Sequence, residues 1–424
     1  MAPQPGVGRL RRSAGHPAAR LLRASLLAQV ALVVSGPLVV RMLGVTDRGQ
    51  LALVFAVVLL VSQVGVAGLP AAVTWFVASR RLDAAAFLAR LQRQFVRQVV
   101  ACSVLAAAVV LLLDIADHPL PRVWLLALVV ALGVAAVMAA MLGMAALQGQ
   151  QRFGVLARLQ PLPAVSYALA TALLLVTGGG TVALLLAINL AGWAVVAVVS
   201  LRLVARGVPG DGTEFPAPVA VRSYARSAMV TTAAPIDTLG IEQLLVGLIG
   251  GHYLLGLFTI GWAFETGPVV VLVALASFVG PRLSTLPAPQ RAAFVRRWLL
   301  VAVGVGVAAC LAIQVVLAPL LVLAFGAEAE PAVPLARVLV AAGVVLGLRR
   351  VTSSCLVGLG RAATATRAEM AGLALMLAGF AVMAVASVGG TYPGWVLLVA
   401  GTVTLVGQLA VLARAASSGE PASA

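Results

Sequence analysis

Three acidic residues lie within long apolar stretches of the sequence: Asp237, Glu242 and Glu265. A charged side chain within a membrane span costs about 2.5–3.5 kcal/mol on insertion scales, so each acid is a candidate for binding a coupling ion. Asp237 and Glu242 are about 140° apart around a helix and do not form one carboxylate pair. Pro235 should kink the chain beside Asp237. Pairing of Asp237 or Glu242 with an arginine that holds two helices together remains the structural alternative.

Two arginines begin apolar stretches at corresponding places in the two halves of the chain, Arg23 and Arg226. Ser25 and Gln29 continue from Arg23 as a polar strip, because residues four apart share a helix face. Arginine in such a position either binds an anion through its planar guanidinium fork or extends its charge to the membrane interface.

The elements that position these side chains must be membrane helices. The 424 residues are 62% hydrophobic and 10% charged, with a mean hydropathy of +1.10, which lies outside the range of soluble domains. We count twelve apolar stretches of the roughly 20 residues that a helix needs to cross the hydrocarbon. They lack the alternating polarity of barrel strands. The predicted fold is an all-α integral membrane protein with about twelve transmembrane helices.

Arginine placement predicts the orientation. All 29 basic residues are arginine, and twelve spans with both termini inside put 25 of them, Arg349 and Arg350 included, on the cytoplasmic side. The four left outside are Arg41, Arg48, Arg122 and Arg337. We therefore expect a multi-pass protein of a bacterial plasma membrane with cytoplasmic termini. The dispersal of the arginines argues against a nucleic-acid partner, and membrane lipid is the expected one.

Several enzyme and metal-site classes are disfavoured. Without lysine there is no Walker A loop, and three His and three Cys residues are too few and too scattered for a structural zinc site. The acids expected in outer loops are Asp47, Asp114, Asp117, Glu328 and Glu330. These loops are too short to form the platform that a membrane glycosyltransferase or polymerase needs. We therefore predict no enzymatic activity, no cofactor and no metal.

A polar, Gly- and Pro-rich stretch divides the chain at its midpoint. We predict a cytoplasmic linker at 206–222 between an N-terminal six-helix lobe, 1–205, and a C-terminal one, 223–424. The segments Gly44–Gly49 and Gly251–Gly256 have the same glycine spacing and are offset by 207 residues, close to half the chain. Duplications of this kind build transporters, so the two lobes are expected to be pseudo-symmetric.

Six short motifs occur in order along the chain: Arg41–Gly49, Gly68–Ala78, Leu147–Phe153, Asp237 with Gly250–Gly256, Gly280–Ser284 and Gly358–Arg361. Together they resemble the O-antigen-type lipid-linked oligosaccharide flippases of polysaccharide biosynthesis. That family belongs to the multidrug/oligosaccharidyl-lipid/polysaccharide exporter superfamily. The resemblance implies two facing lobes and alternating access that moves a polyprenyl-diphosphate-linked glycan to the outer leaflet. It also implies a polysaccharide polymerase and glycosyltransferases as partners.

The resemblance assigns roles to the polar residues, because a diphosphate favours arginine forks. The predicted diphosphate- and glycan-binding residues are Arg23, Ser25, Gln29, Arg226 and Trp262. The predicted ion-coupling residues are Asp237, Glu242 and Glu265. Alternatives are a multidrug or cation antiporter of the same superfamily, a lipid II flippase, a membrane glycosyltransferase or a scaffold subunit. The antiporter is disfavoured because the first six spans contain no mid-span acid.

Overall fold

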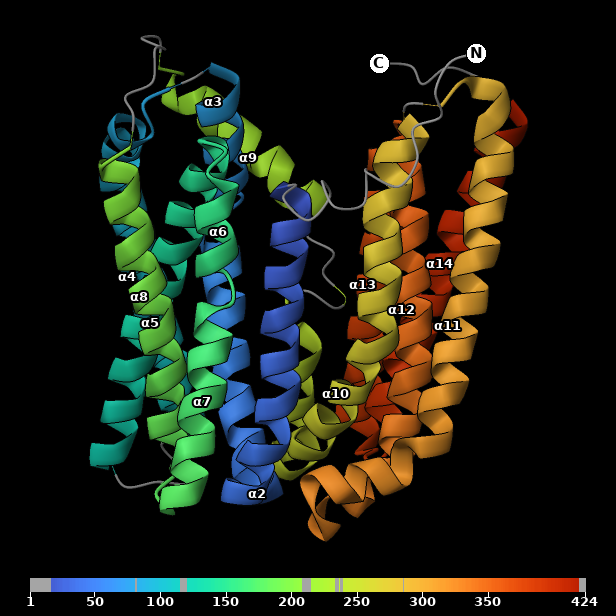
Figure 1. Cartoon of the computed structure of the whole chain (residues 1–424). Coiled ribbons are helices and arrows are strands. Elements are labelled where there is room, and N and C mark those ends of the chain that lie inside the picture. Colours follow the sequence, from blue (N-terminus) through green and yellow to red (C-terminus); the bar gives the residue numbers. More distant parts are fainter. Residues whose placement is uncertain are drawn as a thin grey trace, which may run out of the picture. The chain divides into compact units, whose positions relative to one another are not determined.

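The computed structural model describes residues 17–80, 82–114, 120–207, 215–232, 236, 239–284 and 286–418, which are almost entirely helical (Figure 1). The first half contains α2 (Pro17–Gly65), α3 (Leu69–Arg80), α4 (Ala84–Asp114), α5 (Leu120–Gly149), α6 (Phe153–Leu159), α7 (Leu162–Thr177) and α8 (Val182–Ala205). The second half contains α9 (Pro218–Thr232), α10 (Ile241–Ser284), α11 (Ala288–Phe325), the 3₁₀ helix η1 (Ala327–Ala332), α12 (Val333–Gly358), α13 (Ala362–Ala386) and α14 (Tyr392–Ser418). The predicted all-α class is confirmed.

Ten helical segments in the described residues are long and apolar enough to cross a membrane. Those in α2 and α10 have 43 and 40 residues, or about 60 Å of helix, twice the hydrocarbon thickness. Each is interrupted at one glycine, Gly44 (φ 81°, ψ 176°) and Gly251 (φ 76°, ψ 176°). Glycine adopts a positive φ without a Cβ clash. In α2 the break at Gly44 leaves two stretches that are each long enough to cross a membrane, Arg23–Leu43 and Val45–Gly65. In α10 only Ile241–Gly250 precedes the break, which is about 15 Å of helix and too short to cross. The described residues thus contain ten such segments, one of them long enough for two spans, against the about twelve spans predicted.

The chain forms two compact units, which we call the first and the second unit. The first comprises the residues up to Met42 and Val57–Thr232, and the second comprises Leu43–Ala56 and the residues from Ala233. The predicted boundary at 206–222 differs from this division, because α9 belongs to the first unit. Tyr224 of α9 stacks on Trp75 of α3, with ring centroids 4.9 Å apart. Phe215, within the predicted linker, stacks on Phe87 of α4 at 6.4 Å.

In the first unit, α5 is the central helix and packs against α3, α4 and α8. Glycines let α5 approach α8 closely, since a Cβ at Gly133 would overlap Leu190 and one at Gly143 would overlap Ser200. Small residues at helix contacts are typical of membrane proteins, where water does not drive apolar side chains together. Apolar residues such as Leu112 stay exposed on the outer helices, as expected for a surface covered by lipid.

In the second unit, α12 is the central helix and packs against α10, α11 and α14. Gly343 lies against Glu265 of α10, and Gly347 lies against Leu272 one to two turns further along. The missing side chains at the two glycines let the backbones of α10 and α12 come together. Gly343 therefore helps to enclose one of the predicted ion-coupling acids.

The predicted seventh span is interrupted. α9 ends at Thr232 and α10 begins at Ile241, and the described residues between them are non-helical. Gly240 has a φ of 68°, which is a left-handed conformation. Pro235 removes a helical hydrogen-bond donor in the same stretch. The interruption is longer than the kink expected from Pro235. Asp237 and Pro235 themselves lie outside the described residues.

Candidate functional site

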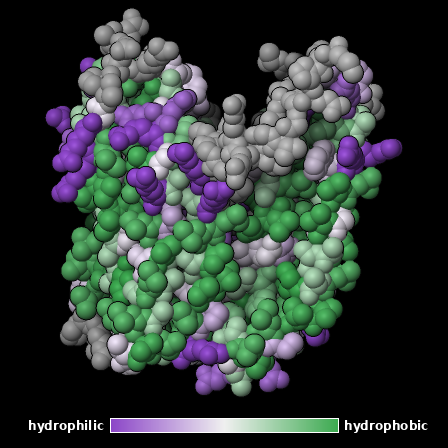
Figure 2. All heavy atoms as spheres, viewed as in Figure 1, coloured by the Kyte–Doolittle hydropathy of each residue, from purple (hydrophilic) through white to green (hydrophobic). Residues whose placement is uncertain are grey.

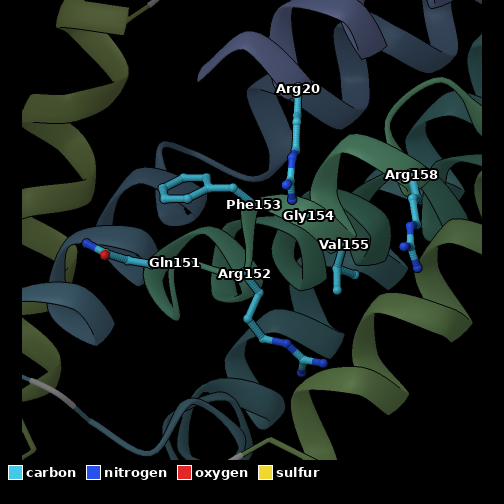
Figure 3. A pocket seen from close by; sticks show the side chains of 7 residues that line it. All are labelled: Arg20, Gln151, Arg152, Phe153, Gly154, Val155 and Arg158. Carbon is cyan, nitrogen blue, oxygen red and sulfur yellow. The ribbon is translucent and has the colours of Figure 1, made fainter. Parts of the chain in front are cut away.

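Two adjoining hollows lie in the first unit, with volumes of about 390 and 490 Å³. The first is lined by Arg20, Gln151, Arg152, Phe153, Gly154, Val155 and Arg158 (Figure 3). The second is lined by Arg20, Arg23, Ala24, Leu27, Gly154, Ala157 and Arg158. Arg20 and Arg158 line both hollows, so the two form one cationic surface. Hydrophilic side chains gather at this end of the unit, around the start of α2, α6 and the end of α8 (Figure 2).

The start of α2 and the short helix α6 position the arginines. Arg20 and Arg23 are three residues apart on α2 and therefore point to the same side. Arg20 extends toward Gly154 of α6 (Figure 3). A Cβ built at Gly154 would lie 3.7 Å from Nη1 of Arg20, an ordinary contact distance, so the guanidinium rests against the backbone of α6. Arg158 follows one turn further along α6.

Arg152 has a structural partner in the same unit. Its Nη1 donates a hydrogen bond of 2.7 Å to the carbonyl oxygen of Leu203, one of the last residues of α8. The carbonyl groups in the last turn of a helix lack the usual backbone N–H donor, so the hydrogen bond from Arg152 caps α8. Arg20, Arg23 and Arg158 are exposed, and none makes an ion pair with any residue that the structure describes. Three guanidinium groups are thus available to an anion.

Of the polar strip predicted on α2 (Arg23, Ser25 and Gln29), only Arg23 faces a hollow. Arg23 lines the second hollow. The Ser25 hydroxyl accepts a hydrogen bond of 2.8 Å from Nε2 of Gln160, which ties α2 to the junction of α6 and α7. Gln29 is exposed on α2, and neither Ser25 nor Gln29 is among the lining residues.

Arg226 does not line the hollows either. We expected it to be the counterpart of Arg23 in the opposite lobe. Arg226 is exposed on α9, and α9 belongs to the same unit as Arg23. The chain returns to the first unit after the linker because the aromatic rings of Phe215 and Tyr224 pack there. Aromatic packing, which the arginine pattern does not reveal, places this residue.

The remaining predicted residues lie in the second unit. Glu242 is in the first turn of α10 and is 1% exposed, and Glu265, further along the same helix, is 2% exposed. Trp262 is half-buried, and its carbonyl accepts a hydrogen bond of 3.0 Å from the hydroxyl of Thr266. Within the described residues, no group of three or more His, Cys, Asp or Glu side chains could hold a metal ion.

A buried ion pair joins three helices of the second unit. Nη1 of Arg349 on α12 donates to Oε2 of Glu369 on α13, and Nε2 of Gln408 on α14 donates to Oε1 of the same carboxylate at 3.1 Å. Arg349 and Gln408 are completely buried, and Glu369 is 5% exposed. Arg349, which the sequence analysis counted as a cytoplasmic orientation signal, is therefore buried between helices and does not lie in an exposed segment. The positive charge of Arg349 is tolerated between the helices because the carboxylate of Glu369 neutralises it.

Sequence reasoning missed this network and three members of the hollow. Arg20 and Arg158 entered the sequence analysis only as orientation signals, and Arg152 entered as an orientation signal and as part of the motif Leu147–Phe153. Their grouping joins residues more than 130 positions apart. The sequence did contain a local signal for Arg349. It lies sixteen residues after the first residue of α12, within the helix and not in a connecting loop. Glu369 has a comparable signal, seven residues into α13.

Comparison with known proteins identifies the architecture. No family model and no curated protein matches the sequence. Among solved structures, the chain is similar to an outward-facing multidrug resistance MATE family transporter of the MOP superfamily, with 16% identity, a TM-score of 0.59 and 98% of each chain covered. An inward-facing form of such a transporter gives 15% identity, a TM-score of 0.63 and 96% of each chain.

This is the fold of the MOP transporters. A MOP superfamily transporter from Pyrococcus furiosus, described as having a binding pocket of reverse polarity, is also similar, with 15% identity and a TM-score of 0.59. The similarity covers 98% of this chain and 99% of that one. The predicted multi-span helical fold is therefore found over essentially the full length of both chains. At these identities the similarity concerns the MOP fold and not the cargo.

Proposed function

We propose that this protein is a membrane transporter that flips a polyprenyl-diphosphate-linked oligosaccharide from the inner to the outer leaflet for export of a cell-surface polysaccharide. The observation that carries the proposal is the grouping of Arg20, Arg23 and Arg158 around one pair of hollows. Guanidinium forks match phosphate oxygens in geometry and charge. A diphosphate is the anionic part of such a lipid.

The charge balance of the first unit supports an anionic cargo. Its acids in the sequence are Asp83, Asp114, Asp117, Asp211 and Glu214. Asp83 precedes α4 and caps it through a hydrogen bond of 2.8 Å to the amide of Ala85, and Asp114 is the last residue of α4. Neither of these two described acids lies in the middle of a span, and no acid is among the residues that line the hollows.

The proposed cycle follows from these features. The arginine-rich end of the first unit faces the cytoplasm, as the arginine distribution predicts, and takes up the diphosphate while the prenyl chain remains in lipid. A change between inward- and outward-facing forms, both recorded for MATE transporters of this fold, releases the glycan outside. Glycosyltransferases would supply the cargo and a polymerase would consume it. Both termini are then cytoplasmic, and the host membrane is a bacterial plasma membrane.

Coupling to an ion gradient is assigned to the second unit. Glu242 and Glu265 are buried acids in α10, and Asp237 precedes them in the interrupted seventh span. An acid in a membrane segment costs free energy to insert, so each of these residues is a functional candidate by default. We propose that proton or cation binding at these acids drives the cycle.

A multidrug or cation antiporter is the second candidate, because two of the similar solved structures are described as multidrug resistance transporters. A cationic drug requires acids at its binding site, and the hollows of the first unit present arginines instead. A glycosyltransferase has less support, since the described connections between helices contain no folded outer domain.

The deciding experiment removes the gene from its host and analyses polyprenyl-diphosphate sugars by mass spectrometry. A flippase predicts accumulation of a lipid-linked repeat unit that is accessible only from the cytoplasmic face, and the mass identifies the cargo. The accumulation should be reversed by the wild-type gene and not by a triple variant with Arg20, Arg23 and Arg158 replaced by Gln. No accumulation, together with increased sensitivity to cationic drugs, would establish the antiporter.

A further inference from the structure

Helix α4 presents exposed arginines near its start and exposed apolar side chains further along. Arg93 and Arg97 are exposed, and so are Val100 and Val104, at 56% and 63%. At 100° per residue these four side chains fall within an arc of about 60°, so they form one continuous face. The face is polar at the start of the helix and apolar beyond Arg97. This is the polarity profile of a lipid molecule, whose headgroup adjoins its acyl chains.

The length of α4 places the two arginines at the level of the headgroups. α4 ends at Asp114, and Arg97 is about 26 Å from that end along the helix axis, while Arg93 is about 32 Å from it. The hydrocarbon core is about 30 Å thick. A helix that crosses the bilayer with Asp114 at one boundary therefore brings Arg97 and Arg93 to the opposite boundary. Lipid phosphates lie at that depth.

The charge of Arg93 and Arg97 is not balanced within the helix. Asp114 is the only acid in the α4 sequence, at its far end. Neither Arg93 nor Arg97 makes an ion pair with any residue in the described part of the chain. Two like charges four residues apart destabilise a helix. Arg90, one turn earlier, is engaged differently, because its guanidinium lies 4.0 Å from the centre of the Phe215 ring. Within the described residues, the guanidinium groups of Arg93 and Arg97 are thus open to an external anion.

We propose that Arg93 and Arg97 form a binding site for the headgroup of an anionic phospholipid, with the acyl chains along Val100 and Val104. The site is on the outside of the first unit and is distinct from the hollows, which Arg20, Arg23 and Arg158 line. It requires only that α4 spans a membrane. It does not depend on the nature of the cargo.

The test uses purified full-length protein in detergent, mixed with vesicles of phosphatidylcholine alone or with phosphatidylglycerol as a minority lipid. Lipid retained after size-exclusion chromatography is quantified by mass spectrometry, and the midpoint of thermal unfolding is recorded. The wild type should retain phosphatidylglycerol preferentially and be stabilised by it. R93Q/R97Q should reduce the preference for phosphatidylglycerol by about 30-fold, from two arginines that each contribute an attraction of about 1 kcal/mol.

The matched control is R202Q/R206Q, which removes the same charge from exposed arginines four residues apart at the end of α8. It should keep most of the preference. A second variant, A89E, leaves both arginines in place and supplies a carboxylate four residues before Arg93, where it competes with the phosphate. A89E should lower lipid retention while raising stability in detergent without lipid.

Equal losses in R93Q/R97Q and R202Q/R206Q would overturn the proposal, because they would show attraction to the overall charge alone. Displacement of phosphatidylglycerol by inorganic phosphate at matched concentration would also overturn it, since the acyl chains would then contribute nothing. If R93Q/R97Q does not fold, A89E still tests the proposal. Undiminished retention of phosphatidylglycerol by A89E would contradict a lipid site at Arg93.

Discussion

Gly49 and Gly256 make reciprocal contacts in the second unit. A Cβ at Gly49 would overlap the main-chain carbonyl of His252, and a Cβ at Gly256 would overlap that of Val45. Val45 and His252 each directly follow an interrupting glycine, Gly44 or Gly251, and all these residues are related by the same offset of 207 positions. The repeat in the sequence is therefore a symmetric crossing of two helical segments whose backbones touch.

Replacement of Gly49 by Ala should destabilise this crossing. The neighbouring atoms belong to the backbone of α10 and cannot rotate away, so we expect a loss of about 1–3 kcal/mol, as for overpacked cores. Thermal unfolding of the purified protein in detergent measures it. The control is Gly304→Ala in α11, where nothing lies within 4 Å of the added Cβ. Equal midpoints for the two variants would show that the crossing tolerates a side chain.

Loss of charge at Glu369 should be more harmful than loss of the whole ion pair. Glu369→Gln leaves Arg349 buried without that carboxylate, which typically costs 3–5 kcal/mol. The double variant R349M/E369L removes both charges and should recover most of the stability, because apolar replacements of buried pairs are often neutral. A double-mutant cycle on unfolding midpoints measures the coupling. Additive effects would mean that the pair contributes no net interaction.

Arg158→Gln should weaken binding of a polyprenyl-diphosphate lipid by about tenfold or more, since a hydrogen bond to a charged group contributes about 1.5–3 kcal/mol. Arg226→Gln, outside the hollows, is the matched control and should leave affinity nearly unchanged. Binding of a fluorescent analogue to protein in nanodiscs provides the readout. An equal effect of both substitutions would favour the original prediction that Arg226 binds the cargo.

Asp237→Asn and Glu265→Gln should abolish transport while leaving folded protein in the membrane. Each change keeps the shape of the side chain and removes the charge that would bind a coupling ion. Flux into proteoliposomes under an imposed ion gradient, with expression checked by fluorescence size-exclusion chromatography, is the measurement. Wild-type flux in both variants would remove ion coupling from the mechanism. Loss of folded protein would instead identify these acids as structural.

The presence of many membrane spans, their helical nature and the equivalence of Gly44 with Gly251 could be read from the sequence. Membrane insertion depends on the apolar length of each segment, and a positive φ is accessible mainly to glycine, so both are local properties. The aromatic residues that draw α9 to the first unit were visible, but their partner helix was not. Charge counting also acts segment by segment, and the side on which it places most arginines stays a prediction.

Tertiary structure alone decided which charges meet. Arg349 has the sequence context of an orientation signal, yet it is buried because Glu369, on the next helix, neutralises it. The hollow exists because α2 and α6 place Arg20 and Arg158 together from positions far apart in the chain. The energy of a charge depends on its distance from the opposite charge and from water. Neither distance follows from helical periodicity, so these sites appear only when the helices are packed.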